Sequence, residues 1–267
     1  MPSVHCLHRY LPSAAPRRPF SRIVVAVDSS AASERAVRLA VAVASGDARS
    51  ELVFCHVIDI PWMLARVDHG ADDYELALET AQESARGLLD RCIAAAAKAD
   101  VFGRSCLRYG KPAEEVATLA NAFAADLIVV GNRPCGRVHR ILNGSVRDEL
   151  VRNSALPVLV AERCEPDAAA SSEECVLAEL AGASSSETVL RAASSFASSY
   201  GLELVCLPGA KRLRARCRAI ESAVGELHPA LLVIGTPAER SLRDRVFPTI
   251  VERTLQSVSA PVLVVHY

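Results

Sequence analysis

The chain has 267 residues, enough for one large domain or two small ones, and 51% of them are hydrophobic although only 4% are aromatic. Its core must therefore be built from alanine, valine, leucine and isoleucine, which suits packed layers of helices and strands. The net charge of −1 excludes a strong field that would favour nucleic acid or an acidic membrane, and no apolar run reaches the length of a membrane-spanning helix.

The first twenty residues contain four prolines and lack the apolar region of a secretory signal. His5, Cys6 and His8 are close in sequence, but no fourth metal ligand stands near them. We therefore predict a flexible tail over residues 1–20 and no metal site.

The nine cysteines are scattered through the chain, and no two of them form a CxxC pair. This spacing argues against a disulfide framework or a zinc knuckle. It is typical of small buried thiols in a reducing compartment, so we expect a cytoplasmic protein.

Strands and helices alternate from residue 21 onward. The first strand, 23–27, is β-branched and ends at Asp28, and Ser33 is expected at or near the N-cap of the helix that follows. The next elements are predicted in this order: a strand at 52–57, a helix at 74–99, a strand at 105–109, a helix that begins at Pro112, a strand at 126–130, a helix at 145–153 and a strand at 157–161. The alternation predicts an α/β fold with an open, mostly parallel sheet covered on both faces.

The same pattern returns after residues 163–175, which have the composition of a linker. The segment LIVVG at 127–131 recurs as LLVIG at 231–235, and LPVLVA at 156–161 recurs as APVLVV at 260–265, both with an offset of 104 residues. A repeat this regular predicts two tandem domains, at 21–162 and 176–267.

The second copy is shorter and less polar than the first. Only 28 residues separate Leu207 from Gly235, against 74 between the matching Val57 and Gly131. We therefore expect the second copy to lack the long helix and the third strand. Asp28 of the first copy corresponds to Ala181, and Gly144-Ser145 corresponds to Pro248-Thr249.

In an open α/β sheet, ligands bind beyond the carboxyl ends of the strands. Asp28, Val57 and Gly131 end three predicted strands, and Gly144 and Ser145 open a helix whose N-terminus presents free N–H groups. Basic residues surround this point: Arg133, Arg137, His139, Arg140 and Arg147. The arrangement predicts a polyphosphate site. The simpler alternatives are a helix cap for Asp28, a turn glycine for Gly144 and a solvated face for the arginines.

These motifs resemble the universal stress protein family, whose loop pattern is glycine, two residues, glycine, nine residues, then Gly-Ser or Gly-Thr. Gly131 and Gly144-Ser145 match that pattern, VDSS at 27–30 and HVID at 56–59 resemble its first two strand motifs, and NSALPVLVA at 153–161 resembles its closing strand. The resemblance covers nearly the whole chain after residue 20 as a tandem pair of Rossmann-like domains of the adenine-nucleotide-binding type. Pro134 departs from it, because it occupies the position of the second glycine.

The resemblance implies which residues would hold ATP, with or without Mg²⁺. Asp28 and Val57 would contact adenine, Gly131 and Asn132 would lie near ribose and phosphate, and Gly144, Ser145 and Val146 would hold the phosphates. It also implies pairing of the closing strands, 158–161 against 262–265, inside the chain or between two chains.

We therefore expect an ATP-binding stress-response or regulatory protein with one weak site in the first domain, and no nucleic-acid or membrane partner. The loop contains no general base, so we assign no catalytic residue and expect at most slow hydrolysis. A nucleotide-free scaffold or dimerisation module is the alternative. An adenylating enzyme is a third reading, but the chain contains neither an SGGxDS loop nor an HxGH motif.

Overall fold

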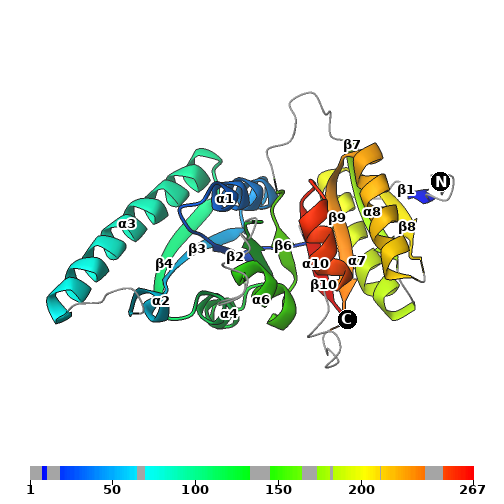
Figure 1. The fold of residues 1–267 in the computed structure, drawn as a ribbon. Coiled ribbons are helices and arrows are strands. Elements are labelled where there is room, and N and C mark those ends of the chain that lie inside the picture. The colour runs from blue at the N-terminus through cyan, green and yellow to red at the C-terminus, as the bar shows by residue number, and fades with distance from the viewer. Residues whose placement is uncertain are drawn as a thin grey trace. The chain divides into compact units, whose positions relative to one another are not determined.

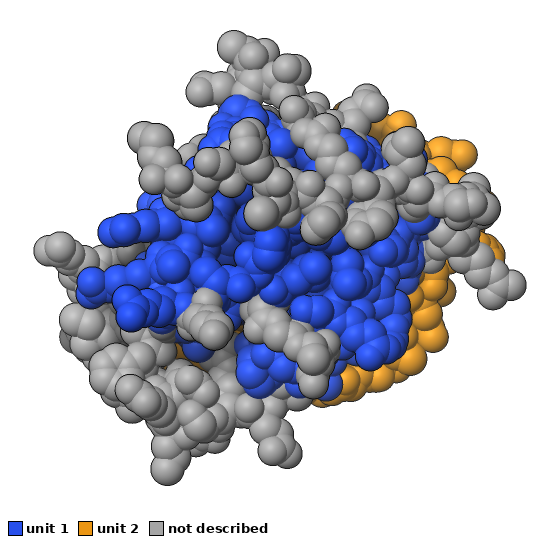
Figure 2. Space-filling model, turned by 90° about the vertical axis from the view of Figure 1, so that its right-hand side faces the viewer, with its two compact units in different colours: residues 1–19, 155–267 blue, residues 20–154 orange. Residues whose placement is uncertain are grey.

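The computed structural model describes residues 8–10, 19–64, 70–132, 145–163, 173–180, 183–210, 212–237 and 249–267. The chain divides into two compact units, shown in separate colours in Figure 2. Residues 20–154 form the N-terminal unit, and residues 1–19 together with 155–267 form the C-terminal unit. Each unit has the predicted α/β architecture, with parallel strands between layers of helices (Figure 1).

The sheet of the N-terminal unit is parallel throughout, in the strand order β5-β2-β3-β4. Its strands are β2 (Arg22–Ala26), β3 (Glu51–Ile58), β4 (Phe102–Tyr109) and β5 (Leu127–Val130). Every residue of β5 is buried, as expected for a strand covered on both faces. The observed β4 begins three residues before the predicted strand at 105–109.

Five described helices cover this sheet: α1 (Ala31–Ala44), α2 (Ile60–Leu64), α3 (Gly70–Lys98), α4 (Pro112–Ala122) and α6 (Val146–Asn153). Figure 1 shows α1 and α3 on one face and α4 and α6 on the other, and the helices of each pair contact one another. Pro112 begins α4 as predicted, because a first-turn position needs no N–H donor. The short α2 was not predicted.

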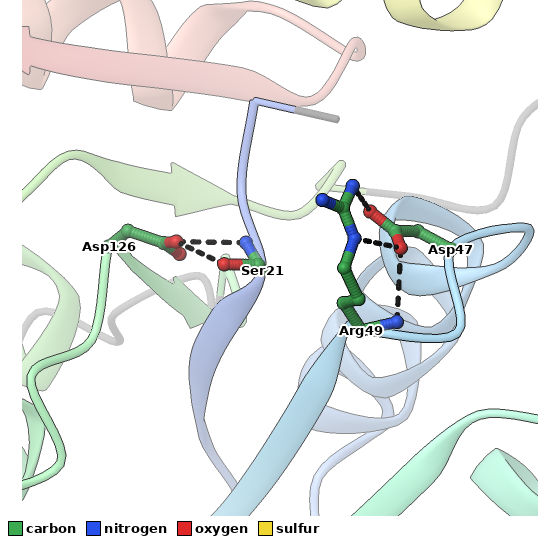
Figure 3. Close-up of polar contacts among 4 residues, drawn as sticks. All are labelled: Ser21, Asp47, Arg49 and Asp126. Atoms are coloured by element: carbon green, nitrogen blue, oxygen red, sulfur yellow. Dashed lines mark hydrogen bonds and ion pairs between the residues drawn. The ribbon is translucent and has the colours of Figure 1, made fainter. Parts of the chain in front are cut away.

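The amino ends of β2 and β5 are tied together by Asp126. Its carboxylate accepts hydrogen bonds from the backbone N–H of Ser21 at 2.8 Å and from the Ser21 hydroxyl at 3.1 Å (Figure 3). It also accepts one from the backbone N–H of Arg22 at 3.0 Å. The turn before β3 is closed by a paired contact between Arg49 and Asp47, with Nε and a terminal nitrogen each donating to one carboxylate oxygen. These contacts lie at the amino ends of the strands, and the carboxyl ends of the strands lie on the opposite side of the unit.

The C-terminal unit has the strand order β1-β8-β7-β9-β10-β6, in which β7, β8, β9 and β10 are parallel. The strands are β1 (His8–Tyr10), β6 (Val158–Val160), β7 (Glu173–Leu180), β8 (Glu203–Pro208), β9 (Pro229–Thr236) and β10 (Val262–His266). The helix α7 (Ala183–Tyr200) packs on the strands, as does α8 (Leu213–Leu227), which also contacts α10 (Ile250–Ser257). Among the described residues, α8 is the one helix between β8 and β9, so the predicted loss of the long helix and third strand is confirmed.

The two closing strands pair with one another, as predicted. β6 and β10 are antiparallel, with Val160 opposite Val262, Leu159 opposite Leu263 and Val158 opposite Val264. All of these residues are buried. The predicted domain boundaries follow the sequence repeat, whereas β6, the last strand of the first repeat, belongs to the C-terminal unit.

The expectation of a flexible tail over residues 1–20 is wrong for His8–Tyr10, which pair antiparallel with β8. The cause lies in the second repeat rather than in the tail. Because that repeat has no third strand of its own, β8 presents the N–H and C=O groups of an open edge, and β1 satisfies part of them.

Candidate functional site

The register of the N-terminal sheet brings three of the predicted site residues to one edge. Ala26 lies opposite Cys55, and Val25 lies opposite Val129. Asp28 and Val57 each follow the first of these pairs by two residues, and Gly131 follows Val129 by two residues. Since the strands are parallel and adjacent, Asp28, Val57 and Gly131 all leave the sheet on the side of its carboxyl ends.

His56, for which no role was predicted from the sequence, holds the carboxyl ends of β2 and β3 together. Its Nδ1 lies 2.8 Å from the backbone oxygen of Val27. A carbonyl oxygen can only accept, so Nδ1 carries the proton and donates. A second bond, from the backbone N–H of Val27 to the oxygen of Cys55 at 2.9 Å, holds the same two strand ends together. His56 stands inside the HVID segment, which was the available signal.

Asp28 is part of a network that starts α1. Its Oδ1 accepts hydrogen bonds from the backbone N–H of Ser30, at 2.9 Å, and from the Ser30 hydroxyl. Its own N–H donates to the hydroxyl of Ser33 at 2.9 Å. Ser30 is the N-cap, and its hydroxyl accepts from the N–H of Ser33 at 3.2 Å. Ser33 was predicted at or near the N-cap; the cap itself is Ser30, and Ser33 supports it from inside the first turn.

Gly131 is required for a close approach of two backbone segments. A Cβ atom at this position would lie 2.6 Å from the backbone oxygen of Ala32 and 2.7 Å from its carbonyl carbon. Only glycine lets the chain leaving β5 pass against the first turn of α1 in this way. Gly131 therefore determines where the Asp28 network lies relative to the end of β5.

Asn132 and Arg147 connect the end of β5 to the first turn of α6. Both side chains are buried, with 2% of Asn132 and 5% of Arg147 exposed. The Arg147 guanidinium donates to Oδ1 of Asn132, and its Nε donates to Oδ1 of Asp148 at 2.8 Å. A buried cation with two fixed acceptors thus lies beside the helix start where the resemblance implies phosphate.

Ser145 is the N-cap of α6, and among the described residues its side chain makes no capping hydrogen bond. The matching residue of the second repeat, Thr249, behaves differently. Its hydroxyl accepts from the N–H of Glu252, and the Glu252 carboxylate accepts from the N–H of Thr249 at 3.0 Å, which completes a capping box. In the first repeat, Asp148 stands where Glu252 stands in the second and holds Arg147 instead.

The second repeat also fills its strand end with an ion pair. Glu179, in the position of Ala26, is only 2% exposed, and both of its carboxylate oxygens accept hydrogen bonds from Arg216 at 2.8 Å. Glu179 and Arg216 are therefore bound to one another at this strand end.

Several residues of the predicted site and its loop lie outside the described residues: Gly144, Pro134, Arg133, Arg137, His139 and Arg140. The same holds for Ala181 and Pro248, their counterparts in the second copy. Val146, the remaining residue of the predicted set, is the first residue of α6 and is half-buried. The described part of the predicted site is thus assembled on β2, β3, β5, α1 and α6.

The described cysteines are mostly buried, as expected from the sequence: Cys55, Cys92, Cys175 and Cys206 are buried, and Cys106 and Cys217 are half-buried. Burial, with a smaller effect of Cys106, raises the pKa of Cys55 to about 12. Such a thiol is a poor nucleophile at neutral pH. Among the described residues, no three His, Cys, Asp or Glu side chains are grouped so that they could hold a metal ion. None of the described helices is both long and apolar enough to cross a membrane.

Comparison with known proteins decides the family. The sequence model of the universal stress protein family matches residues 19–162. The chain belongs to the universal stress protein family. A universal stress protein of Methanocaldococcus jannaschii is 28% identical over 144 residues, which are 54% of this chain and 83% of that protein. One of Mycolicibacterium smegmatis is 32% identical over 195 residues, or 69% of this chain and 62% of that protein.

A solved structure extends the likeness to both units. The crystal structure of a universal stress protein from Archaeoglobus fulgidus matches with a TM-score of 0.72 and 15% sequence identity, covering 92% of this chain and 98% of that one. At this identity the likeness concerns the fold. It supports the tandem arrangement that the sequence repeat predicts.

Proposed function

We propose that this universal stress protein binds one adenine nucleotide, ATP with or without Mg²⁺, at the carboxyl edge of the N-terminal sheet. The proposal rests on a difference in helix capping between Ser145 and Thr249. The Thr249 hydroxyl is used by its own helix, whereas the Ser145 hydroxyl makes no such bond among the described residues, with the buried guanidinium of Arg147 two residues away. A helix start with an available hydroxyl and an adjacent cation suits a phosphate group.

The base end of the same site is assigned to Asp28 and Val57, as in nucleotide-binding members of the family. The Asp28 carboxylate is exposed and held by Ser30, so its orientation is fixed before a ligand arrives. We propose a stress-response or regulatory role in the cytoplasm, without catalysis beyond slow hydrolysis.

The test is an ATP titration by calorimetry on the full chain and on two matched variants. Ser145→Ala should weaken binding by about tenfold, because one hydrogen bond to a charged group is lost. Its free energy of unfolding should stay close to that of the parent, since no capping bond is removed. Thr249→Ala should do the reverse, lowering the free energy of unfolding by about 1 kcal/mol and leaving ATP binding unchanged.

Two further results would count against the proposal. A stoichiometry of two equivalent sites would contradict the assignment to one unit. If Asp28→Ala bound ATP as tightly as the parent, the adenine base would not lie at Asp28.

The alternative is a nucleotide-free scaffold, which Pro134 favours because proline offers no N–H to an anion. If Pro134 costs one charge-assisted bond, affinity falls about ten- to a hundredfold and Pro134→Gly restores it. A parent and a Pro134→Gly protein that both fail to bind ATP at millimolar concentration would establish the scaffold.

A further inference from the structure

The outer edge of β8 differs from the matching edge of the first repeat. β8 lies beside β7 as β3 lies beside β2. The other edge of β3 is paired along all eight of its residues with β4. Among the described residues, the other edge of β8 is paired with the three residues of β1, which lie opposite Leu204, Val205 and Cys206 (Figure 1). A segment from the start of the chain thus takes the place of a strand that the second repeat lacks.

Within the described residues this cover is short. There β1 pairs three residues with β8 where β4 pairs eight with β3, so fewer backbone hydrogen bonds hold it. Segments with few backbone bonds open at a low free energy compared with the rest of a fold. The β1 strand can therefore leave β8 without disrupting the remaining sheet.

The strand underneath is suited to pairing with another strand. Residues 204–207 read LVCL and contain no charge or proline, which are the usual means of protecting an edge. Glu203 and Pro208 stand at its two ends. When two such strands pair antiparallel about their common centre, Glu203 faces Pro208, so like charges do not oppose one another.

We propose that the outer edge of β8 is a strand-addition site, covered by β1 within one chain and able to pair with β8 of a second copy when β1 leaves. The same chain already joins two of its strands in this manner, since β6 and β10 pair antiparallel. A two-fold axis through the centre of β8 makes the contact isologous and closes it at two copies. The N-terminal segment thereby regulates self-association.

The test uses the full chain with His8→Pro and Arg9→Pro combined. Adjacent residues of a strand direct their N–H groups to opposite edges, so two successive prolines remove at least one donor that faces β8. The matched control, His8→Ala with Arg9→Ala, keeps both N–H groups. Hydrogen exchange of residues 203–208 is measured at low protein concentration, and the mass by sedimentation velocity over a range of higher concentrations.

In the proline variant, exchange of residues 203–208 should accelerate by about tenfold or more at low concentration. Its weight-average mass should rise towards twice that of the parent as concentration increases. The alanine control should match the parent in both measurements. Adding Leu207→Lys to the proline variant should return the mass to the parent value, because a lysine would oppose Leu204 of the second copy across the strand pair.

Each other outcome overturns the proposal. Unchanged exchange in the proline variant would mean that β1 does not protect β8. Faster exchange with no rise in mass would mean that the freed edge does not pair with a second copy. Recovery of an unrelated peptide bound to that edge would mean that the partner of β8 is another protein and not a second copy of this chain. A rise in mass that Leu207→Lys leaves intact would assign the association to another surface.

Discussion

The guanidinium of Arg147 donates a hydrogen bond to the side-chain oxygen of Asn132, so the first turn of α6 is fixed to the residue that follows Gly131 at the end of β5. Both side chains are almost completely buried. Desolvating a cation is unfavourable unless its donors are satisfied, so this pair constrains the phosphate end of the proposed site before any ligand binds.

Substitutions at Asn132 separate its structural role from its place in the proposed nucleotide site. Asn132→Leu removes an acceptor from a buried guanidinium and should lower the free energy of unfolding by about 1–3 kcal/mol. Asn132→Asp keeps the acceptor and should retain the parent stability in urea. It should nevertheless weaken ATP binding by about tenfold, because a negative charge is placed near the phosphates. An Asn132→Asp protein that binds ATP as tightly as the parent would show that the phosphates lie elsewhere.

The two repeats offer a matched pair of glycine substitutions. Gly131→Ala directs its Cβ at the backbone of Ala32, which cannot move without displacing the first turn of α1. It should cost about 1–3 kcal/mol, as overpacking does. Gly235→Ala, at the equivalent position, meets side-chain atoms of Val189 and Tyr267 at 3.0–3.2 Å, and side chains can shift. Its cost in thermal or urea unfolding should be the smaller of the two, and the reverse order would contradict this account of Gly131.

The layers of the fold could be predicted from the sequence because the strands are uninterrupted apolar runs. Runs such as IVVA and LIVV read as buried parallel strands, and the 104-residue offset predicted the second unit, whereas the pairing of β6 with β10 was implied by the family resemblance. The strand β1 could not be predicted in this way. His8–Tyr10 have no apolar alternation, and they form a strand because β8 offers an open edge.

The candidate site was predicted residue by residue, but not its internal contacts. Ser30 and Ser33 are equally good caps by composition, and the choice depends on which hydroxyl faces the first turn. Arg147 was one of several basic residues near the loop. Its burial against Asn132 depends on the placement of α6 relative to β5, which local sequence does not encode.

The raised pKa of Cys55 predicts a loss of stability at alkaline pH. Burial keeps this thiol protonated in the folded protein up to about pH 12, whereas the ordinary value is 9.0. Above pH 9 the unfolded chain therefore binds fewer protons than the folded one, and stability falls as pH rises, by up to about 1.4 kcal/mol per pH unit. Cys55→Ala should make the decline between pH 9 and 11 shallower in urea unfolding. An equal slope in parent and variant would mean that Cys55 ionises readily in the folded protein.

The ion pair between Glu179 and Arg216 predicts how the second repeat responds to loss of one partner. Arg216→Ala leaves the carboxylate of Glu179 buried and without the guanidinium that binds both of its oxygens. The free energy of unfolding should fall by about 3–5 kcal/mol, because a buried charge loses its counter-ion. Arg191→Ala is the matched control, since Arg191 pairs with Glu187 on the surface, where 74% and 77% of the side chains are exposed. That change should cost less than about 0.5 kcal/mol.

The same comparison bears on the number of nucleotide sites. Combining Glu179→Leu with Arg216→Leu replaces the pair by apolar side chains and should recover most of the stability lost in Arg216→Ala. ATP binding should be the same in the parent, Arg191→Ala and the double variant, because the ion pair belongs to the repeat to which the proposal assigns no site. A double variant that binds no ATP while remaining folded would place part of the nucleotide site in the C-terminal unit, and a double variant less stable than Arg216→Ala would show that the pair contributes more than mutual neutralisation.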